Sequence, residues 1–362
     1  MKQTVLKIIK YLVIVLIIVG IVWLVRFFFF STPTGQNILS VLLPQQAAQP
    51  VATTTAQQLN ALTSEPIFDY WVSTSTNTVF YATDAGQIMK LSNAQTTPLT
   101  SQTITRLHSI TASSDGAFAV AEFNYPALPL FSILTTANGT WQPLPVGTIA
   151  AAWSPDKDQL AYLSSTALNI LDMTTNKTTQ VIPLTQEELA MAWVTDSKIV
   201  LSTLPTSKLN TQTWTIDPVK RTVTSSLEAP GAITHWSQDG SMGIMLTNTN
   251  NTPVTSLIDP SQNQLSQFSF VTMPEKCAFD GPKIYCAIPK NIPTQATLPD
   301  DFYKKSVYFD DAIYLIDLSS GGFTEVQTGS TAPIDATHLE VQGSSLLFIN
   351  RLDNKLYALT LQ

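Results

Sequence analysis

The chain has 362 residues, of which 44% are hydrophobic and 12% charged, and its formal net charge is −7. This apolar fraction excludes an intrinsically disordered protein, because disordered chains lack the apolar surface that offsets the entropy of folding. Removing the first 30 residues takes away four bases and no acids, which leaves 15 bases against 26 acids. We expect no nucleic-acid partner, since phosphate backbones would repel such a body.

The amino terminus has the pattern of a membrane anchor. Lys2, Lys7 and Lys10 precede an apolar segment, residues 11–30, that only Arg26 interrupts. Twenty helical residues span about 30 Å, the thickness of the hydrocarbon core. The three lysines predict a cytoplasmic tip and place the body outside the cytoplasmic membrane, periplasmic or extracellular. A cleaved signal peptide is the alternative, but no small-residue cleavage site follows directly, so residues 1–30 are interpreted as an uncleaved signal anchor.

Residues 31–64 have the composition of a linker. They contain no charged residue and are rich in Gln, Ala, Thr, Ser and Pro. Such a segment cannot bury enough apolar surface to fold alone, and it is expected to act as a spacer. Part of it, within residues 51–62, is a candidate for a closing outer strand of the domain that follows.

The remainder of the chain, residues 65–362, repeats with a period of about 41 residues. Each unit has an apolar strand, a polar turn and further short strands. With Trp153 as the reference, the equivalent positions are Trp71, Ala112, Trp193, Trp236, Cys277 and Leu339. Units of this length with several strands are typical of β-propellers, whereas solenoid units are usually shorter. Seven units therefore predict an all-β, seven-bladed β-propeller.

Three features of the repeat lead to structural expectations. The last unit has only three strands, so the segment within residues 51–62 is expected to close the ring and remove an open sheet edge. The tryptophans at the shared position are expected to pack between blades rather than to bind carbohydrate. Carboxylates three residues beyond the shared position are expected to hold the turns; they are Asp115, Asp156, Asp196, Asp239 and Asp280.

The repeat resembles a known class of propeller. The segment AAWSPDKDQLAY at residues 151–162 and the segment at residues 235–240 look like the units of TolB-type, WD-repeat-like proteins and of propeller domains in some serine peptidases. The resemblance covers residues 68–362 and implies the fold and a general habit of binding other proteins. TolB-type proteins have a separate amino-terminal α/β domain where this chain has the predicted anchor, so a TolB role is not implied.

Cys277 and Cys286 are the only cysteines, and they flank the turn at residues 280–283. If this turn has two central residues, Cys277 faces Cys286 at a position where a disulfide can form. A body outside the cytoplasm permits oxidation. A redox pair is the alternative, but the CxxC spacing that lowers a thiol pKa is missing. A structural disulfide is therefore favoured.

The sixth unit contains the one sizeable insertion. Forty residues separate Cys277 from Asp317, where other units take 19 to 24 over the same stretch. Exposed aromatic side chains among charges are typical of binding hot spots, so the insertion provides the candidate binding residues: Asp300, Asp301, Phe302, Tyr303, Tyr308 and Phe309. The alternative is that these aromatic side chains fold back and cover the blade.

The sequence lacks the common signatures of enzymes. It contains no GxSxG, HExxH, CxxC or glycine-rich phosphate loop. His235 and His338 each precede a shared repeat position and are interpreted as packing residues. No catalytic residue, metal or cofactor is predicted. The favoured function is a protein-binding module of the cell envelope. The alternatives are a hydrolase or lyase acting on a glycan or peptide, with acids among Asp300, Asp301, Asp310 and Asp311, and a purely structural module.

Overall fold

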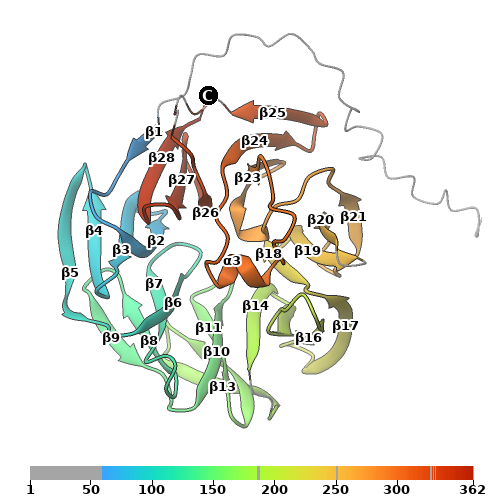
Figure 1. The fold of residues 1–362 in the computed structure, drawn as a ribbon. Helices are drawn as coiled ribbons and strands as arrows, with labels where there is room; N and C mark the ends of the chain where they lie inside the picture. Colours follow the sequence, from blue (N-terminus) through green and yellow to red (C-terminus); the bar gives the residue numbers. More distant parts are fainter. Residues whose placement is uncertain are drawn as a thin grey trace, which may run out of the picture. The chain divides into compact units, whose positions relative to one another are not determined.

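The computed structural model describes residues 59–185, 188–249, 252–326, 328, 330 and 332–361. These residues form seven antiparallel four-stranded sheets, which stand side by side around a common axis (Figure 1). The chain visits the sheets in sequence order, as the colour gradient around the ring shows. The prediction of an all-β, seven-bladed β-propeller is confirmed. We number the blades 1 to 7 in chain order.

In blades 1 to 3 the strands follow one another from the axis outward. Blade 1 contains β2 (Ile67–Ser73), β3 (Thr78–Thr83), β4 (Gln87–Ser92) and β5 (Gln95–Thr103). Blade 2 contains β6 (Leu107–Ala112), β7 (Phe118–Phe123), β8 (Leu130–Thr135) and β9 (Thr140–Pro143). Blade 3 contains β10 (Thr148–Trp153), β11 (Gln159–Ser164), β12 (Ala167–Asp172) and β13 (Lys177–Pro183).

Blades 4 to 7 complete the ring. Blade 4 contains β14 (Leu189–Thr195), β15 (Lys198–Thr203), β16 (Asn210–Asp217) and β17 (Thr222–Pro230). Blade 5 contains β18 (Ile233–Trp236), β19 (Gly243–Thr249), β20 (Thr252–Ile258) and β21 (Gln264–Gln267). Blade 6 contains β22 (Cys277–Asp280), β23 (Lys283–Pro289), β24 (Asp311–Asp317) and β25 (Gly322–Val326). Blade 7 contains β26 (Ala336–Gln342), β27 (Ser345–Asn350), β28 (Lys355–Thr360) and β1 (Leu59–Ala61).

Blade 7 joins the two ends of the described chain. β1 pairs antiparallel with β28, so that Leu59 faces Leu359 and Ala61 faces Tyr357. The Leu62 N–H then donates to the carbonyl of Leu356 at 2.8 Å. β1 thus lies within residues 51–62 and supplies the fourth strand of the last blade. Because β28 would otherwise present a free edge, this pairing closes the ring.

The blades pack against one another through the shared tryptophans. The Trp153 indole N–H donates to the carbonyl of Thr111 in blade 2, with an N–O distance of 3.0 Å. Trp71 lies in a buried cluster with side chains of blade 2, and Trp193 in a cluster with side chains of blade 3. The expected packing between blades is confirmed for these three. Since neighbouring blades cover both faces of a sheet, second strands such as β11 are buried along most of their length.

Aspartates hold several turns between first and second strands. The Asp115 carboxylate accepts hydrogen bonds from the Ala117 N–H at 2.9 Å and from the Ser113 hydroxyl at 2.7 Å. In blade 5 the Asp239 carboxylate accepts from the Ser241 N–H at 3.0 Å. Gly240 follows with a φ of +65°, a conformation that glycine adopts without steric cost. These turns have the construction that the sequence predicts.

Blade 6 departs from the predicted alignment of the repeats. Cys277 begins β22 rather than ending it, because the turn of Gly281 and Pro282 has only two central residues and the strand continues to Asp280. Cys277 faces Cys286 with a Cα–Cα distance of 4.1 Å, and the two form the expected disulfide. In blade 5 the third strand ends at Ile258, one residue before its predicted end.

The predicted membrane segment, residues 11–30, and the linker as far as residue 58 lie outside the described residues. Within the described part of the chain, no helix has the length and apolar character needed to cross a bilayer. The two helices of that part are short: η1 (Pro274–Lys276) and α3 (Asp300–Tyr303).

Deleting residues 51–62 is expected to lower the melting temperature and broaden the unfolding transition, because β28 loses its partner strand. Three lost residue pairs, at about 1 kcal/mol for each hydrogen bond, imply a loss on the order of 3 kcal/mol. Deletion of residues 39–50 removes the same length and keeps β1, so it is the control. Thermal melting followed by circular dichroism checks this, and equal melting of both variants would contradict it.

Candidate functional site

Two adjoining cavities lie along the axis of the ring. The first has a volume of about 680 Å³ and lies where the turns between first and second strands of blades 3 to 7 meet. The second, of about 560 Å³, is lined mainly by first strands of blades 1, 2, 5, 6 and 7. Gln238, Phe279 and Val341 line both cavities. We call them the mouth and the inner cavity, and the end of the ring with these turns the turn face.

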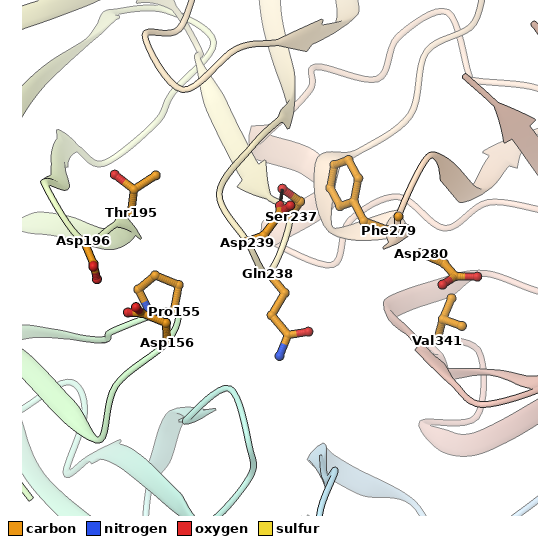
Figure 2. Close-up of a pocket in the computed structure, with 11 residues that line it drawn as sticks. Pro155, Asp156, Thr195, Asp196, Ser237, Gln238, Asp239, Phe279, Asp280 and Val341 are labelled. Carbon is orange, nitrogen blue, oxygen red and sulfur yellow. Dashed lines mark hydrogen bonds between the residues drawn. The ribbon is translucent and has the colours of Figure 1, made fainter. Parts of the chain in front are cut away.

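Carboxylates from the repeated turn position surround the mouth. Asp156, Asp196, Asp239 and Asp280 come from four successive blades, and Gln238 extends into the space between them (Figure 2). Among the described residues no lysine or arginine lines this cavity. Hydrogen bonds from Ser237 and the Ser241 N–H hold the pKa of Asp239 below its usual range. The mouth therefore has a negative potential at neutral pH.

One basic side chain lies beside the mouth. The Lys157 ammonium is 2.8 Å from the Asp196 carboxylate, and both side chains are about half exposed. This contact lowers the pKa of Asp196 and raises that of Lys157. It offsets one of the four carboxylates, so the negative potential of the mouth remains.

The inner cavity brings together ionisable side chains from four elements. They are Asp69 on β2, His235 on β18, Glu275 on η1, and His338 and Glu340 on β26. Asp69 and His338 are 269 residues apart in sequence, yet their carboxylate oxygen and imidazole Nδ1 lie 2.7 Å apart. Adjacent blades 1 and 7 supply the two partners, so closure of the ring creates this pair.

His338 lies in an unusual backbone conformation. Its φ is +49°, in the left-handed region, where the register of β26 with β27 shifts between Thr337 and Glu340. This conformation costs a non-glycine residue about 1 kcal/mol or more. The Tyr70 hydroxyl donates to the His338 carbonyl at 2.7 Å and helps to hold it. Strained residues of this kind cluster at functional sites.

The environment sets the charge of each group in the inner cavity. The Asp69 carboxylate raises the pKa of His338 to about 9, so its imidazole is charged at neutral pH. Burial, with repulsion from Asp69, raises the pKa of Glu340 to about 7. Burial and repulsion from His338 lower the pKa of His235 to about 4, so this second imidazole is neutral. Perturbed groups in a cavity are characteristic of functional sites.

The insertion of blade 6 covers the other end of the axis. It connects β23 to β24 and emerges opposite the turn face, and α3 lies in front of the axis in Figure 1. Phe302 and Phe309 are buried, with exposed fractions of 2% and 4%, whereas Tyr303 and Tyr308 remain nearly half exposed. The two phenylalanines thus fold back and cover the blade, which is the alternative that the sequence left open for the insertion. The two tyrosines remain accessible to a partner.

The acidic residues of α3 are engaged within the protein. The Asp300 carboxylate accepts hydrogen bonds from the N–H and the hydroxyl of Ser207 in blade 4, the first at 2.9 Å. The Asp301 carboxylate accepts from the Thr297 N–H at 2.7 Å and from the Ser306 hydroxyl at 3.2 Å. These contacts tie the insertion to blade 4 and stabilise its own turn.

A buried ionic network fixes the insertion to blades 6 and 7. The Lys276 ammonium lies 2.7 Å from Asp311 and 2.5 Å from Asp335, and all three side chains are fully buried. The Arg351 guanidinium lies 2.8 Å from Asp335 and donates to the carbonyl of Phe302 at 2.9 Å. Such a network is stable only when each charge is paired, so the insertion is held rigidly.

The candidate acids for hydrolysis do not converge. Asp310 pairs with exposed Lys290 at 3.0 Å, and Asp311 belongs to the buried network. Asp300 and Asp301 face the separate partners described above. None of the four lines the mouth or the inner cavity. The arrangement therefore offers no acid–base pair around a common substrate position.

Exposed apolar side chains gather at the end of the ring that carries the insertion, which we call the insertion face. In propeller topology this face bears the loops between second and third strands and the connections between blades. Eight of the twelve large apolar side chains that are exposed in the described residues belong to these loops. They are Tyr125, Leu128, Val146, Leu204, Leu209, Tyr303, Tyr308 and Leu352.

The histidines do not form one group. His235 and His338 line the inner cavity, but His108 stacks on Tyr125 at a ring distance of 4.3 Å. The packing interpretation does not fit His338, whose side chain is 43% exposed within the cavity and pairs with Asp69. Over the described residues, no group of three or more His, Cys, Asp or Glu side chains could hold a metal ion.

Sequence reasoning did not single out Asp69, Glu275 or Glu340 for the site. One signal was available in β26, where polar side chains alternate at His338, Glu340 and Gln342. Alternation on an innermost strand predicts side chains that face the axis. The pairing with Asp69 had no local signal, because it depends on how blade 7 meets blade 1.

Comparison with known proteins supports the fold alone. No family model matches the chain, and no curated protein matches its sequence. An oligogalacturonate lyase in complex with manganese is similar in structure, at 14% identity, with a TM-score of 0.58 over 86% of this chain and 94% of that chain. The WD40 repeats of RRP9 give 12% identity and a TM-score of 0.54 over 85% and 99% of the two chains.

A third similar structure is the Cps50 (Swd1) β-propeller domain of Myceliophteria thermophila. It is 12% identical, with a TM-score of 0.53 over 84% of this chain and 100% of that chain. At such identities the shared property is the architecture of a WD40-like β-propeller. The class of the protein is therefore defined by its blades, and its function has to be argued from its own side chains.

Replacing Lys276 by Met is expected to lower the free energy of unfolding by about 3–5 kcal/mol, because Asp311 would remain buried without its cation. The matched control is Lys290→Met, which removes an exposed pair with Asp310 and is expected to cost about 1 kcal/mol or less. Denaturant unfolding of both variants measures the difference. Similar small losses in the two variants would contradict the buried network.

The His338 imidazole is expected to titrate with a midpoint near pH 9, well above its usual value of 6.5. Asp69→Asn should lower the midpoint markedly, because it removes the charge that contributes most to holding the proton. The pair with Asp69 stabilises the folded state fully below about pH 6.5, and this contribution is lost as the pH rises through about 9. NMR of ¹⁵N-labelled histidine checks this, with His338→Asn assigning the signal; a wild-type midpoint near 6.5 would contradict it.

Proposed function

We propose that the protein is a membrane-anchored β-propeller that binds other proteins of the cell envelope through its insertion face. Residues 11–30 form the anchor, the amino terminus lies in the cytoplasm, and the propeller lies outside the cytoplasmic membrane. The propeller then acts as a rigid interaction module that follows a spacer. The WD40-like architecture, common among proteins that bind proteins, is consistent with this assignment.

The observation that carries the proposal is the unequal distribution of exposed apolar side chains between the two faces. Tyr303 and Tyr308 stand exposed on an insertion whose backbone is hydrogen-bonded to the buried side chains of Arg351 and Asp335. Leu128, Leu204 and Leu209 are exposed in other loops of the same face. Rigid aromatic side chains surrounded by polar groups make good binding anchors, since little side-chain entropy is lost when a partner covers them.

Two observations support the location outside the cytoplasm. The twenty apolar residues at 11–30 follow three lysines, which favours an N-terminus on the cytoplasmic side. The Cys277–Cys286 disulfide is the kind of bond that persists in oxidising compartments. These features are independent of each other, because one lies in the anchor and the other in blade 6.

We propose binding rather than catalysis as the activity. A hydrolase or lyase using Asp300, Asp301, Asp310 and Asp311 would need carboxylates that converge on a substrate. Each of these four carboxylates contacts a different group within the protein, as described above. A purely structural module is not favoured either, since it would have no reason to gather most of its exposed large apolar side chains on one face.

Site-specific photo-crosslinking in membranes tests the proposal. A photoreactive residue at Tyr308 or Leu209 is expected to yield a discrete protein adduct, because both side chains lie on the insertion face. The control position is Val219, which is exposed in a turn of blade 4 on the turn face. Adducts from Val219 alone, or from no position, would contradict binding through the insertion face.

The same preparation tests the anchor. Full-length protein is expected in the membrane pellet, and detergent but not high salt should release it. In intact spheroplasts its propeller should be accessible to added protease. Removing residues 11–30 should move the propeller to the supernatant. A propeller shielded from protease in spheroplasts would exclude the proposed location, whatever the crosslinks show.

A further inference from the structure

The insertion narrows the channel at the insertion face. There a small cavity of about 150 Å³ is lined by Tyr303, Tyr308 and Arg351 together with His338 and Glu275, which also line the inner cavity. The buried network holds this cover in place. The mouth, at about 680 Å³, is much the larger of the two end cavities, so we expect a ligand of the inner cavity to enter at the turn face.

The walls of this path are strongly acidic. Carboxylates line it from the mouth inward, and the one charged base among its lining residues is His338, which Asp69 already neutralises. The carboxylates are Asp156, Asp196, Asp239, Asp280, Asp69, Glu275 and Glu340. Such a path attracts cations and repels anions.

Of the three carboxylates of the inner cavity, Glu340 alone has neither an ion pair nor a hydrogen bond among the described residues. It precedes Val341, which lines both cavities, on β26. Glu275 accepts a hydrogen bond from Thr337 at 3.0 Å, and Asp69 is paired with His338. Glu340 has no hydrogen-bond or ion-pair partner among the described residues. A partly buried carboxylate in this state is stabilised by a ligand that supplies a cation.

The remaining walls suit an alkyl chain. Trp71, Trp236 and Phe279 line the inner cavity beside these carboxylates. Aromatic side chains offer apolar contact to methylene groups and a favourable π-face to a nearby cation. A cavity of about 560 Å³ holds a side chain or a small molecule and excludes a folded domain.

We propose that the channel binds a primary ammonium group on an alkyl stem, which enters from the turn face and pairs with Glu340. The aromatic walls hold the stem, and the aspartates of the mouth draw the cation inward. This site is separate from the insertion face and does not rest on the protein-binding function proposed above.

Binding of the ammonium group is linked to one proton. The ligand favours ionised Glu340, so the proton that the carboxyl holds in part at neutral pH leaves to solvent. The ionisable groups that share the inner cavity with the Glu340 carboxyl are Asp69 from β2, Glu275 from η1, His235 from β18 and His338 from β26, the strand of Glu340. Between pH 6 and 8 the imidazole of His338 stays largely charged and that of His235 neutral, so Glu340 dominates the dependence on pH.

The test is a titration of the full-length protein in detergent with butylammonium chloride, butan-1-ol and sodium butyrate, followed by NMR. Butylammonium is expected to bind at least about tenfold more tightly than butan-1-ol, and butyrate not to bind. Its affinity should rise about tenfold from pH 6 to pH 8, as Glu340 loses its proton. Equal binding of the amine and the alcohol would overturn the proposal.

Matched variants locate the site. Glu340→Gln should weaken butylammonium binding about 10- to 100-fold and abolish the dependence on pH, because the amide cannot form an ion pair. The control is Glu325→Gln, the same change on the exposed outer strand β25, which should bind as the wild type does. Wild-type affinity in Glu340→Gln would overturn the proposal, as would Mg²⁺ or Ca²⁺ binding that requires Glu340 and excludes the amine.

Two further probes distinguish the natural source of the ammonium group. One is the peptide acetyl-Gly-Lys-Gly-amide, and the other is spermidine. Tighter binding of the peptide supports the proposal and identifies a lysine side chain of a partner as the ligand. Tighter binding of spermidine supports it and identifies a free polyamine. Failure of both probes, with butylammonium also unbound, would overturn it.

Discussion

Pairing of β1 with β28 is the contact on which the site depends. It joins the two ends of the described chain in one blade and leaves seven first strands around a single axis. Side chains on those strands have no further blade to pack against, so the axis retains cavities of about 560 and 680 Å³. The same closure sets blade 7 beside blade 1 and thereby brings His338 to Asp69.

The two faces of the ring differ because their connections differ. At the turn face short loops need side-chain oxygens to satisfy backbone N–H groups, and aspartate supplies them, as at Asp239. Carboxylates at or beside the same turn in blades 3, 4 and 6 join Asp239 around the mouth. At the insertion face the connections are longer and free to carry exposed apolar side chains such as Leu209 and Tyr308. The different connections thus make the turn face acidic and leave apolar side chains exposed on the insertion face.

The parts of the fold that could be predicted from the sequence are those that repeat or that lie close together in the chain. The seven blades, the packing of Trp153 against blade 2 and the pairing of Cys277 with Cys286 follow from period and hairpin register. The site could not be predicted in this way, because Lys276 and Asp335 are 59 residues apart and His338 and Asp69 are 269 apart. The acidic residues of the insertion also gave no indication that Asp311 is a buried ion-pair partner while Asp310 is exposed.

The helix η1 connects the cover of the channel to its wall. Its consecutive residues Glu275 and Lys276 face different surroundings, the first lining the inner cavity and the second pairing with Asp311 and Asp335. Opening the insertion would break the hydrogen bonds from Arg351 to the Phe302 carbonyl and from the Phe309 N–H to Asp335, which would leave buried charged groups without these partners. The insertion is thus better described as a fixed wall than as a lid. The wider route to Glu340 is then the acidic mouth, whose charge selects what enters.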